Sequence, residues 1–200
     1  VGAVGVRTAG AQNLLVNGSF EQGAFGSPAG GFISVAPGSA AITGWSIFGD
    51  QIAWITTPNI TPIVGADGTK FLDPGATPAP YGGVTQTITT VAGQRYRLIF
   101  SIGVYEDNAF DPNLGGPVTV RASAGAVSAD FTLSRPANSG LAWASCTLDF
   151  IASGTSTAIS LLGIGGENFI GVDGAAVIVV PSVNWVQWPS SVGGNGHWYA

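Results

Sequence analysis

The chain has 200 residues, of which 46% are hydrophobic and 8% charged, and its formal net charge is −5. A surface that binds nucleic acid needs clustered lysines and arginines, whereas the six here are scattered and include one lysine, Lys70. The composition therefore argues against nucleic acid as a partner. No apolar run approaches the roughly 18 residues of a membrane-spanning helix, so we do not expect the protein to span a membrane.

The length suits one domain with short extensions. Residues 1–6 and 9–11 are small and apolar, and Ala9 and Ala11 have the spacing found before signal-peptide cleavage sites. The segment 1–11 is either a signal-peptide remnant or an assembly arm, and we predict export to the outside or surface of a bacterial cell. We place the domain at 12–181 and a tail rich in Trp and Gly at 182–200.

The single cysteine, Cys146, excludes an internal disulfide framework and a multi-cysteine metal site. It lies in the alternating run 143–150, and no basic residue is near it in the sequence. We therefore expect a packed strand residue rather than a reactive thiol.

From residue 12 onward the pattern is that of β-strands. The runs 84–91 and 95–102 alternate strictly between polar and apolar residues and are separated by the turn Ala92–Gly93, which is typical of half-buried antiparallel strands. Residues 22–40, rich in Gly and Pro, predict an irregular loop, and Gly49–Asp50 predicts a hairpin-like turn. No stretch has a helical period. The predicted strands are 14–16, 41–48, 51–56, 69–72, 84–91, 95–102, 118–123, 126–133, 141–151, 157–164 and 169–180.

This number of short strands predicts an all-β fold, a two-sheet antiparallel β-sandwich of the jelly-roll kind. Five motifs occur in a characteristic order: Asn13–Glu21, Gly44–Trp45, Gln86–Thr87, Tyr96–Ser101 and Gly171–Asp173. Over residues 12–180 the chain resembles the galactose-binding-like jelly rolls of exported bacterial proteins and plant cell-wall proteins of unassigned function. More distantly it is similar to carbohydrate-binding modules of families four and twenty-two.

The resemblance implies a structural Ca²⁺ ion. In those modules the ion is held by the acid that ends the first motif and by an acid of the last strand, which correspond to Glu21 and Asp173. Main-chain carbonyls from Lys70 to Leu72 would complete the oxygen shell that Ca²⁺ prefers. Gly174 stands where the family usually has Asp or Asn, so one ligand of the family set is absent. The alternative is that both carboxylates bind backbone amides or an arginine.

A polar cluster between two predicted strands is the first candidate ligand site. It contains Tyr105, Glu106, Asp107, Asn108, Phe110 and Asp111. Its acids and amides suit a cation or sugar hydroxyls, and its aromatic residues suit a sugar ring. A solvated loop is the favoured alternative, because Asp and Asn also form turns and the spacing is not that of an EF-hand.

Three tryptophans lie in predicted strands. We expect Trp45 in the core, and for Trp54 and Trp143 we favour the core and keep a ligand-facing position as the alternative. Arg95 and Arg97 lie on one strand face, where solvent contact is the expected role.

Catalysis has little support in the sequence. The chain has no Gly-x-Ser-x-Gly motif, and its single histidine, His197, lies in the tail. A glycosidase needs two carboxylates at one site, but Glu106 and Glu167 lie in no recognisable motif.

Two hypotheses on function follow. The first is a secreted, non-catalytic, lectin-like module that binds carbohydrate of the cell surface or matrix and contains a structural calcium. The second is a structural subunit of an extracellular assembly such as a filament or surface layer, whose uncharged termini contact copies of itself or other surface proteins. The tail also resembles the opening strand of C-type lectin-like domains, which would place a second domain after it.

Overall fold

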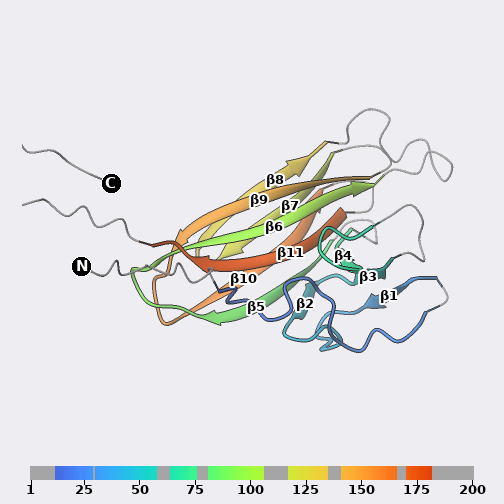
Figure 1. Ribbon diagram of the computed structural model, residues 1–200, viewed down its shortest axis with the longest axis horizontal. Helices are drawn as coiled ribbons and strands as arrows, with labels where there is room; N and C mark the ends of the chain where they lie inside the picture. The colour runs from blue at the N-terminus through green and yellow to red at the C-terminus, as the bar shows by residue number, and fades with distance from the viewer. Residues whose placement is uncertain are drawn as a thin grey trace, which may run out of the picture.

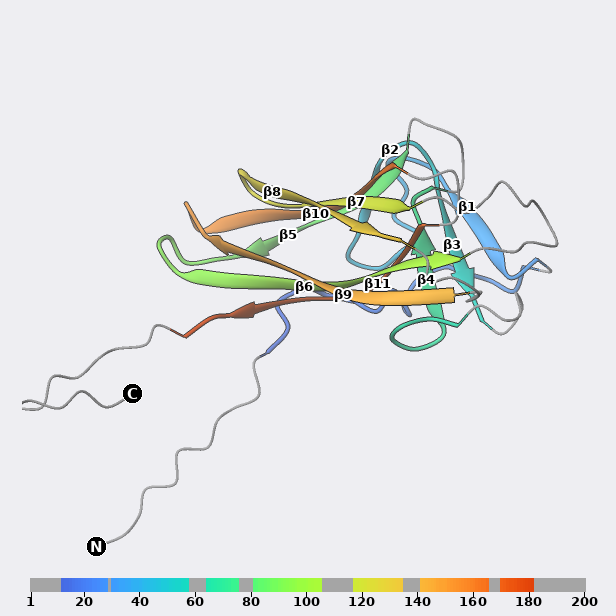
Figure 2. The ribbon, with the colours of Figure 1, turned by 90° about the horizontal axis from the view of Figure 1, so that it is seen from above.

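The computed structural model describes residues 12–28, 30–57, 64–75, 81–105, 117–134, 141–165 and 170–181. Within these residues the chain forms eleven strands and no helix, arranged as two antiparallel sheets that face each other (Figures 1 and 2). The prediction of an all-β sandwich is confirmed. No helix in the described residues has the length and apolar character needed to cross a membrane.

The larger sheet has six strands in the order β1-β3-β4-β11-β6-β9, and the smaller has five in the order β2-β5-β10-β7-β8. The six strands are β1 (Phe32–Val35), β3 (Ile52–Thr56), β4 (Lys70–Asp73), β11 (Ile170–Val179), β6 (Arg95–Tyr105) and β9 (Leu141–Ile151). The five strands are β2 (Ser46–Gly49), β5 (Gly82–Thr89), β10 (Ser156–Gly165), β7 (Val118–Ala124) and β8 (Val127–Leu133).

Most connections carry the chain from one sheet to the other, as in a jelly roll. The predicted hairpin at Gly49–Asp50 is wrong, because β2 pairs with β5 while β3 pairs with β1 and β4. Gly49 has a φ of 74°, and a Cβ there would lie 2.7 Å from the Tyr81 carbonyl oxygen, so the turn needs a glycine. A true hairpin joins β7 and β8.

The N-terminal part departs most from prediction. β1 lies inside the predicted loop 22–40, and the predicted strand 41–48 is shortened to β2, with Ile42 forming only an isolated bridge to Gly23. The predicted strand 14–16 is absent. The backbone N–H and C=O groups of this segment bond largely to side chains rather than to a neighbouring strand.

Residues 13–16 bridge the two sheets through those side chains. The Leu14 amide donates to the Val177 carbonyl of β11, 2.8 Å away, and the Asn13 side chain bonds to Ala175 O and Val177 N of that strand. On the other side, the Gln86 side chain of β5 accepts from the Val16 amide at 2.7 Å and donates to the Val16 carbonyl at 2.9 Å. One extended segment therefore joins an inner strand of each sheet.

The rest of the Asn13–Glu21 motif makes a tight turn against β11. A Cβ on Gly18 would lie 1.8 Å from the Ala175 carbonyl oxygen, so only glycine fits. Asn17 has a φ of 54°, which asparagine tolerates better than most residues, and its side chain bonds to Gln22 and Thr43. This geometry turns Phe20 into the core and leaves Glu21 at its edge.

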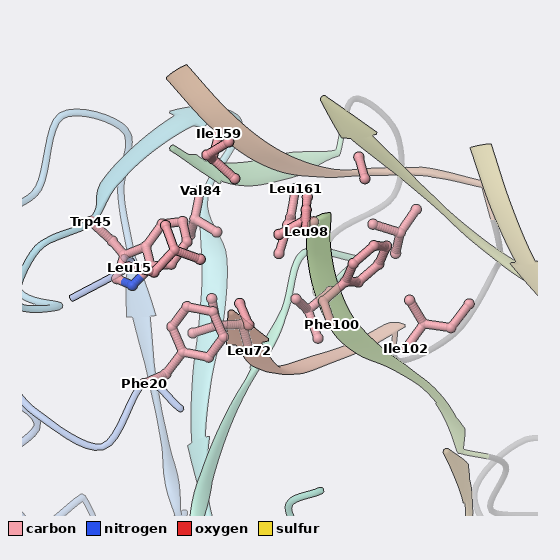
Figure 3. Packing of buried hydrophobic residues seen from close by; sticks show 14 of the residues in the cluster. Leu15, Phe20, Trp45, Leu72, Val84, Leu98, Phe100, Ile102, Ile159 and Leu161 are labelled. Atoms are coloured by element: carbon pink, nitrogen blue, oxygen red, sulfur yellow. The ribbon is translucent and has the colours of Figure 1, made fainter. Parts of the chain in front are cut away.

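The core fills the space between the sheets (Figure 3). Phe20 and Trp45 pack at a centroid distance of 5.2 Å, and β6 contributes Leu98, Phe100 and Ile102. Trp45 and Trp54 are 3% and 0% exposed and donate their indole N–H groups to Asn17 O and Phe20 O. The core position of both tryptophans is confirmed, and Trp54 cannot contact a ligand because its whole surface is covered.

We expect Gln86→Ala to lower the free energy of unfolding by about 1–3 kcal/mol, because the N–H and C=O groups of Val16 lose two part-buried hydrogen bonds, each worth about 0.5–1.5 kcal/mol. The measurement is a urea unfolding curve at constant pH. Thr87→Ala is the matched control, since the exposed Thr87 side chain lies on the opposite face of β5, and it should change stability by no more than about 0.5 kcal/mol. Equal effects of the two substitutions would contradict the bridging role of Gln86.

Candidate functional site

The loop at residues 64–69, which enters β4, is held by three side chains that the sequence singled out. The first is Glu21. Its carboxylate accepts from the Thr69 amide at 2.7 Å, from the Thr69 hydroxyl at 2.8 Å and from the Lys70 amide, and the Lys70 ammonium lies 3.3 Å away. Partial burial opposes ionisation, but these hydrogen bonds lower the pKa of Glu21 below its ordinary value.

The second is Asp173 of β11, which is fully buried. It accepts from the Asp67 amide at 2.8 Å and from the Gly174 amide at 2.7 Å. Burial raises the pKa of Asp173 to about 7, although these amide hydrogen bonds favour the ionised form. Glu21 therefore fixes the end of this loop, and Asp173 fixes its middle.

The predicted calcium can be compared with this geometry. The alternative interpretation, in which both carboxylates bind backbone amides, describes the contacts that are present. Lys70 and Leu72 lie in β4, where Leu72 is in register with both Trp54 and Val172. In the described residues, no group of three or more His, Cys, Asp or Glu side chains could hold a metal. Calcium at Glu21 would have to displace both N–H donors and the Lys70 ammonium, so binding of the ion would require the 64–69 loop to rearrange.

The third side chain is Trp143, which lies on the outer face of the six-stranded sheet, the face turned away from the smaller sheet. Its indole N–H donates to the Val64 carbonyl at 3.0 Å, and its ring meets Phe71 edge to face at a centroid distance of 5.6 Å. We expected the core for this residue; the ring is instead half-buried on the outside of the fold.

Two glycines make room for the Trp143 ring. A Cβ on Gly103 of β6 would lie 2.8 Å from the ring, and one on Gly171 of β11 would lie 2.6 Å from it. These glycines are in register with each other, and Gly103 is in register with Trp143. The backbone of two adjacent strands, β6 and β11, therefore forms a floor under the indole that β9 carries, beside the loop that Glu21 and Asp173 hold.

Beyond Trp143 the outer face continues as rows of side chains set by strand register. Ser145 faces Ser101, Thr147 faces Ile99, and Asp149 faces Arg97. Arg97 bonds Asp149 with two nitrogens at 2.6 and 2.9 Å, and Arg95 adds a bond of 2.7 Å. These bonds hold the pKa of Asp149 far below its ordinary value. The expected solvent-facing role of the arginines holds, with Asp149 as a partner that the sequence analysis did not identify.

Among the other candidate ligand residues, Tyr105 ends β6, two positions after Gly103. Glu106, Asp107, Asn108, Phe110 and Asp111 lie outside the described residues, as do Glu167 and His197. Cys146 is half-buried, packs against the core, and has its thiol pKa raised by burial, which fits the expected packed strand residue.

Sequence reasoning missed the buried carboxyl of Asp73, at the end of β4. Its Oδ1 accepts from the amides of Gly75 and Ile170 at 2.8 and 3.0 Å, while Oδ2 has no hydrogen-bond partner among the described residues. Burial raises the pKa of Asp73 to about 7 against these hydrogen bonds. The sequence Asp73–Pro74–Gly75 could have indicated this carboxyl, because an Asp at the end of a strand and before Pro-Gly often bonds to the turn that follows.

We expect the metal-free protein to become more stable as the pH is lowered from about 8 to about 5, as measured by urea unfolding in EDTA. Asp73 and Asp173 titrate near pH 7 when folded and near 3.8 when unfolded, so in this window the native state binds more protons and the free energy of unfolding falls as pH rises. Asp73→Asn should reduce the slope, and stability that increases with pH would contradict the prediction.

Comparisons with known proteins give a family and distant structural likenesses. A family model described as "Protein of unknown function (DUF642)" matches residues 13–169. A comparison with curated proteins finds no match.

Among solved structures, the chain is similar to the CBM22-1 xylan-binding domain from Paenibacillus barcinonensis, with 10% identity over 76% of this chain and 95% of that chain, at a TM-score of 0.46. It is also similar to a structure described as "CBM4 structure and function", with 14% identity, 83% and 99% coverage and a TM-score of 0.44. A family 35 carbohydrate-binding module from Clostridium thermocellum gives 16% identity, 72% and 97% coverage and a TM-score of 0.38. Families four and twenty-two, named by the sequence resemblance, are among these matches.

Proposed function

We propose that this chain, which belongs to the DUF642 family of proteins of unknown function, is a non-catalytic carbohydrate-binding module that uses the outer face of its six-stranded sheet. The observation that carries the proposal is the Trp143 ring supported on Gly103 and Gly171. The side chain lies outside the main core, and its floor exists only because two adjacent strands carry glycine.

The chemistry of this face suits a sugar. A pyranose ring has an apolar face of C–H groups and a rim of hydroxyls, so it packs on an aromatic side chain while hydrogen-bonding around it. Trp143 offers the aromatic surface, and Ser101, Ser145 and Thr147 offer hydroxyls on the same face. Ligand sites commonly combine aromatic surface with a few placed polar groups in this way.

The length of the face favours a chain of sugars over a single one. Side chains on one face of a strand repeat about every 6.6 Å, so Trp143 and Asp149, three repeats apart on β9, are about 20 Å apart. The Arg95–Asp149–Arg97 cluster at the far end adds donors and acceptors for hydroxyls or charged substituents.

The state of five carboxyl groups in the described residues supports a binding role without catalysis. Asp149 and Asp130 are bonded to arginines, Glu21 is bonded to the 64–69 loop and Lys70, and Asp73 and Asp173 are fully buried. Hydrolysis of a glycosidic bond needs two carboxyl groups on either side of one ligand, whereas these five are either buried or hydrogen-bonded within the fold.

Trp143→Ala should weaken binding to the best ligand at least about tenfold, the effect of losing an aromatic contact worth about 1.4 kcal/mol or more. The measurement is affinity electrophoresis in gels containing xylan, galactan, mannan or dextran, followed by titration. Gly103→Ala keeps the indole but displaces it, so it should weaken binding as well. Thr87→Ala, on the outside of the other sheet, is the control. Failure of every polysaccharide to retard the protein, or full binding by Trp143→Ala, would refute the proposal.

A structural calcium between Glu21 and Asp173 stays part of this proposal, supported by the family resemblance and by the proximity of both carboxylates to one loop. Addition of calcium to EDTA-treated protein should then raise the melting temperature, and Glu21→Gln should remove that increase. An identical melting temperature with calcium and with EDTA would contradict the calcium site. The role of Glu21 and Asp173 would then be to accept hydrogen bonds from backbone amides.

The second candidate function, a subunit of an extracellular assembly, was based on residues 1–11 and 182–200. Both segments lie outside the described residues, as does the predicted start of a lectin-like domain. Export, assembly through the termini and a following domain all stay predictions.

A further inference from the structure

Strand β9 forms one edge of the six-stranded sheet, and Figure 1 shows it along the same long side of the molecule as β8. It pairs with β6 over eleven consecutive positions without a register shift. Within the described residues no strand pairs with its other edge. Half of its backbone N–H and C=O groups therefore point away from the sheet in a straight row.

This edge lacks the features that usually prevent strands from adding to a sheet. Proteins protect long edge strands with proline, lysine or a β-bulge. The sequence 141–151 has no proline, lysine or arginine, and its one charged side chain, Asp149, is bonded to Arg95 and Arg97 of the neighbouring strand. The register shifts occur on interior strands instead, in the β10–β7 and β11–β6 pairs.

We propose that β9 pairs antiparallel with β9 of a second copy of this chain, which joins the two six-stranded sheets into one continuous sheet across a two-fold axis. The register that pairs all eleven residues puts Cys146, the midpoint of Leu141–Ile151, opposite Cys146 of the second copy. In this register positions 142 and 150, 143 and 149, 144 and 148, and 145 and 147 face one another. Each pair has both side chains on the same face of the sheet.

The pairs in this register are complementary. On the inner face Ala142 meets Phe150 and Ala144 meets Leu148, so a small side chain always faces a large one. On the outer face Ser145 meets Thr147, a pair of hydroxyls that can hydrogen-bond across strands. Trp143 meets Asp149 of the second copy together with its arginine partners, which allows a cation–π contact.

Charge also favours β9 over β8, the edge strand of the smaller sheet on the same side of the molecule (Figure 1). In the β9 register the two Asp149 side chains are six positions apart along the strand, about 20 Å, so they do not repel strongly. The corresponding register of β8 (Val127–Leu133) would place its midpoint, Asp130, opposite Asp130 of the second copy. Like charges directly opposite one another destabilise a strand pair.

The first test is the mass in solution. We expect sedimentation or light scattering over a concentration series to give twice the chain mass of 20.1 kDa at the upper end. Ser145→Lys with Thr147→Lys puts like charges across the seam and should return the protein to the mass of one chain. The matched control is Thr87→Lys with Thr89→Lys, two exposed positions of β5, an interior strand of the other sheet; it should stay dimeric, and melting curves establish that all variants fold.

The second test determines the register. Mild oxidation should link two chains through Cys146, because opposed residues of antiparallel strands lie within about 4.5–5.5 Å between Cα atoms, which a disulfide can span. Cys146→Ser should abolish the link, and Ser145→Cys in that background should not restore it although position 145 is more exposed.

A single-chain mass at every concentration, a dimer that survives the double lysine variant, or equal linking through position 145 would overturn the proposal. So would a dimer that appears only after removal of residues 182–200, since those residues would then be the occupant of the edge. None of these outcomes depends on carbohydrate binding.

Discussion

The fold depends on one extended segment that belongs to neither sheet. Residues 13–16 bind β11 on one side and β5 on the other, and they do so largely through the side chains of Asn13 and Gln86 rather than through a strand ladder. Side-chain hydrogen bonds do not require a continuous strand register. The segment can therefore pass from one sheet of the sandwich to the other without belonging to either ladder. The turn that follows, with Gly18 against β11, then directs Phe20 inward and Glu21 outward.

Because Glu21 points outward, the segment that bridges the two sheets is also linked to the outer face of the six-stranded sheet. Glu21 holds one end of the 64–69 loop, Asp173 holds the middle, and Trp143 binds the start of the loop through Val64. The aromatic platform thus rests on the backbone of β6 and β11 and is bordered by a loop that the first motif fixes. A change at Glu21 would therefore reach the Trp143 indole through the loop.

The sequence was most informative where one face of a strand is buried and the other is not. The alternation in 141–151 predicts β9 to the residue, and the same alternation puts Trp143 on the face of Ser145, Thr147 and Asp149, a signal that outweighs the general preference of tryptophan for a core. β1 could not be predicted, because its four residues lie among glycines and prolines and gain their pairing only from β3. The bridging by residues 13–16 was also beyond the local pattern, since the partners lie 70 residues away in β5 and 162 or 164 residues away in β11. The alternation of polar and apolar residues depends only on neighbours along the chain. The hydrogen bonds of residues 13–16 form only when both sheets are in place.

The distance along the chain between the two ends of that bridge has a consequence for folding. The hydrogen bonds from Asn13 reach residues 162 and 164 positions later, in the last strand. Contacts of such sequence separation slow folding, because the loop must close before its contacts are gained. During synthesis the Asn13 side chain has no partner until β11 has emerged, although Gln86 of β5 is made earlier. The first motif to be made is therefore among the last to be ordered, and until that moment the space that Leu15 and Phe20 fill stays open between the two sheets.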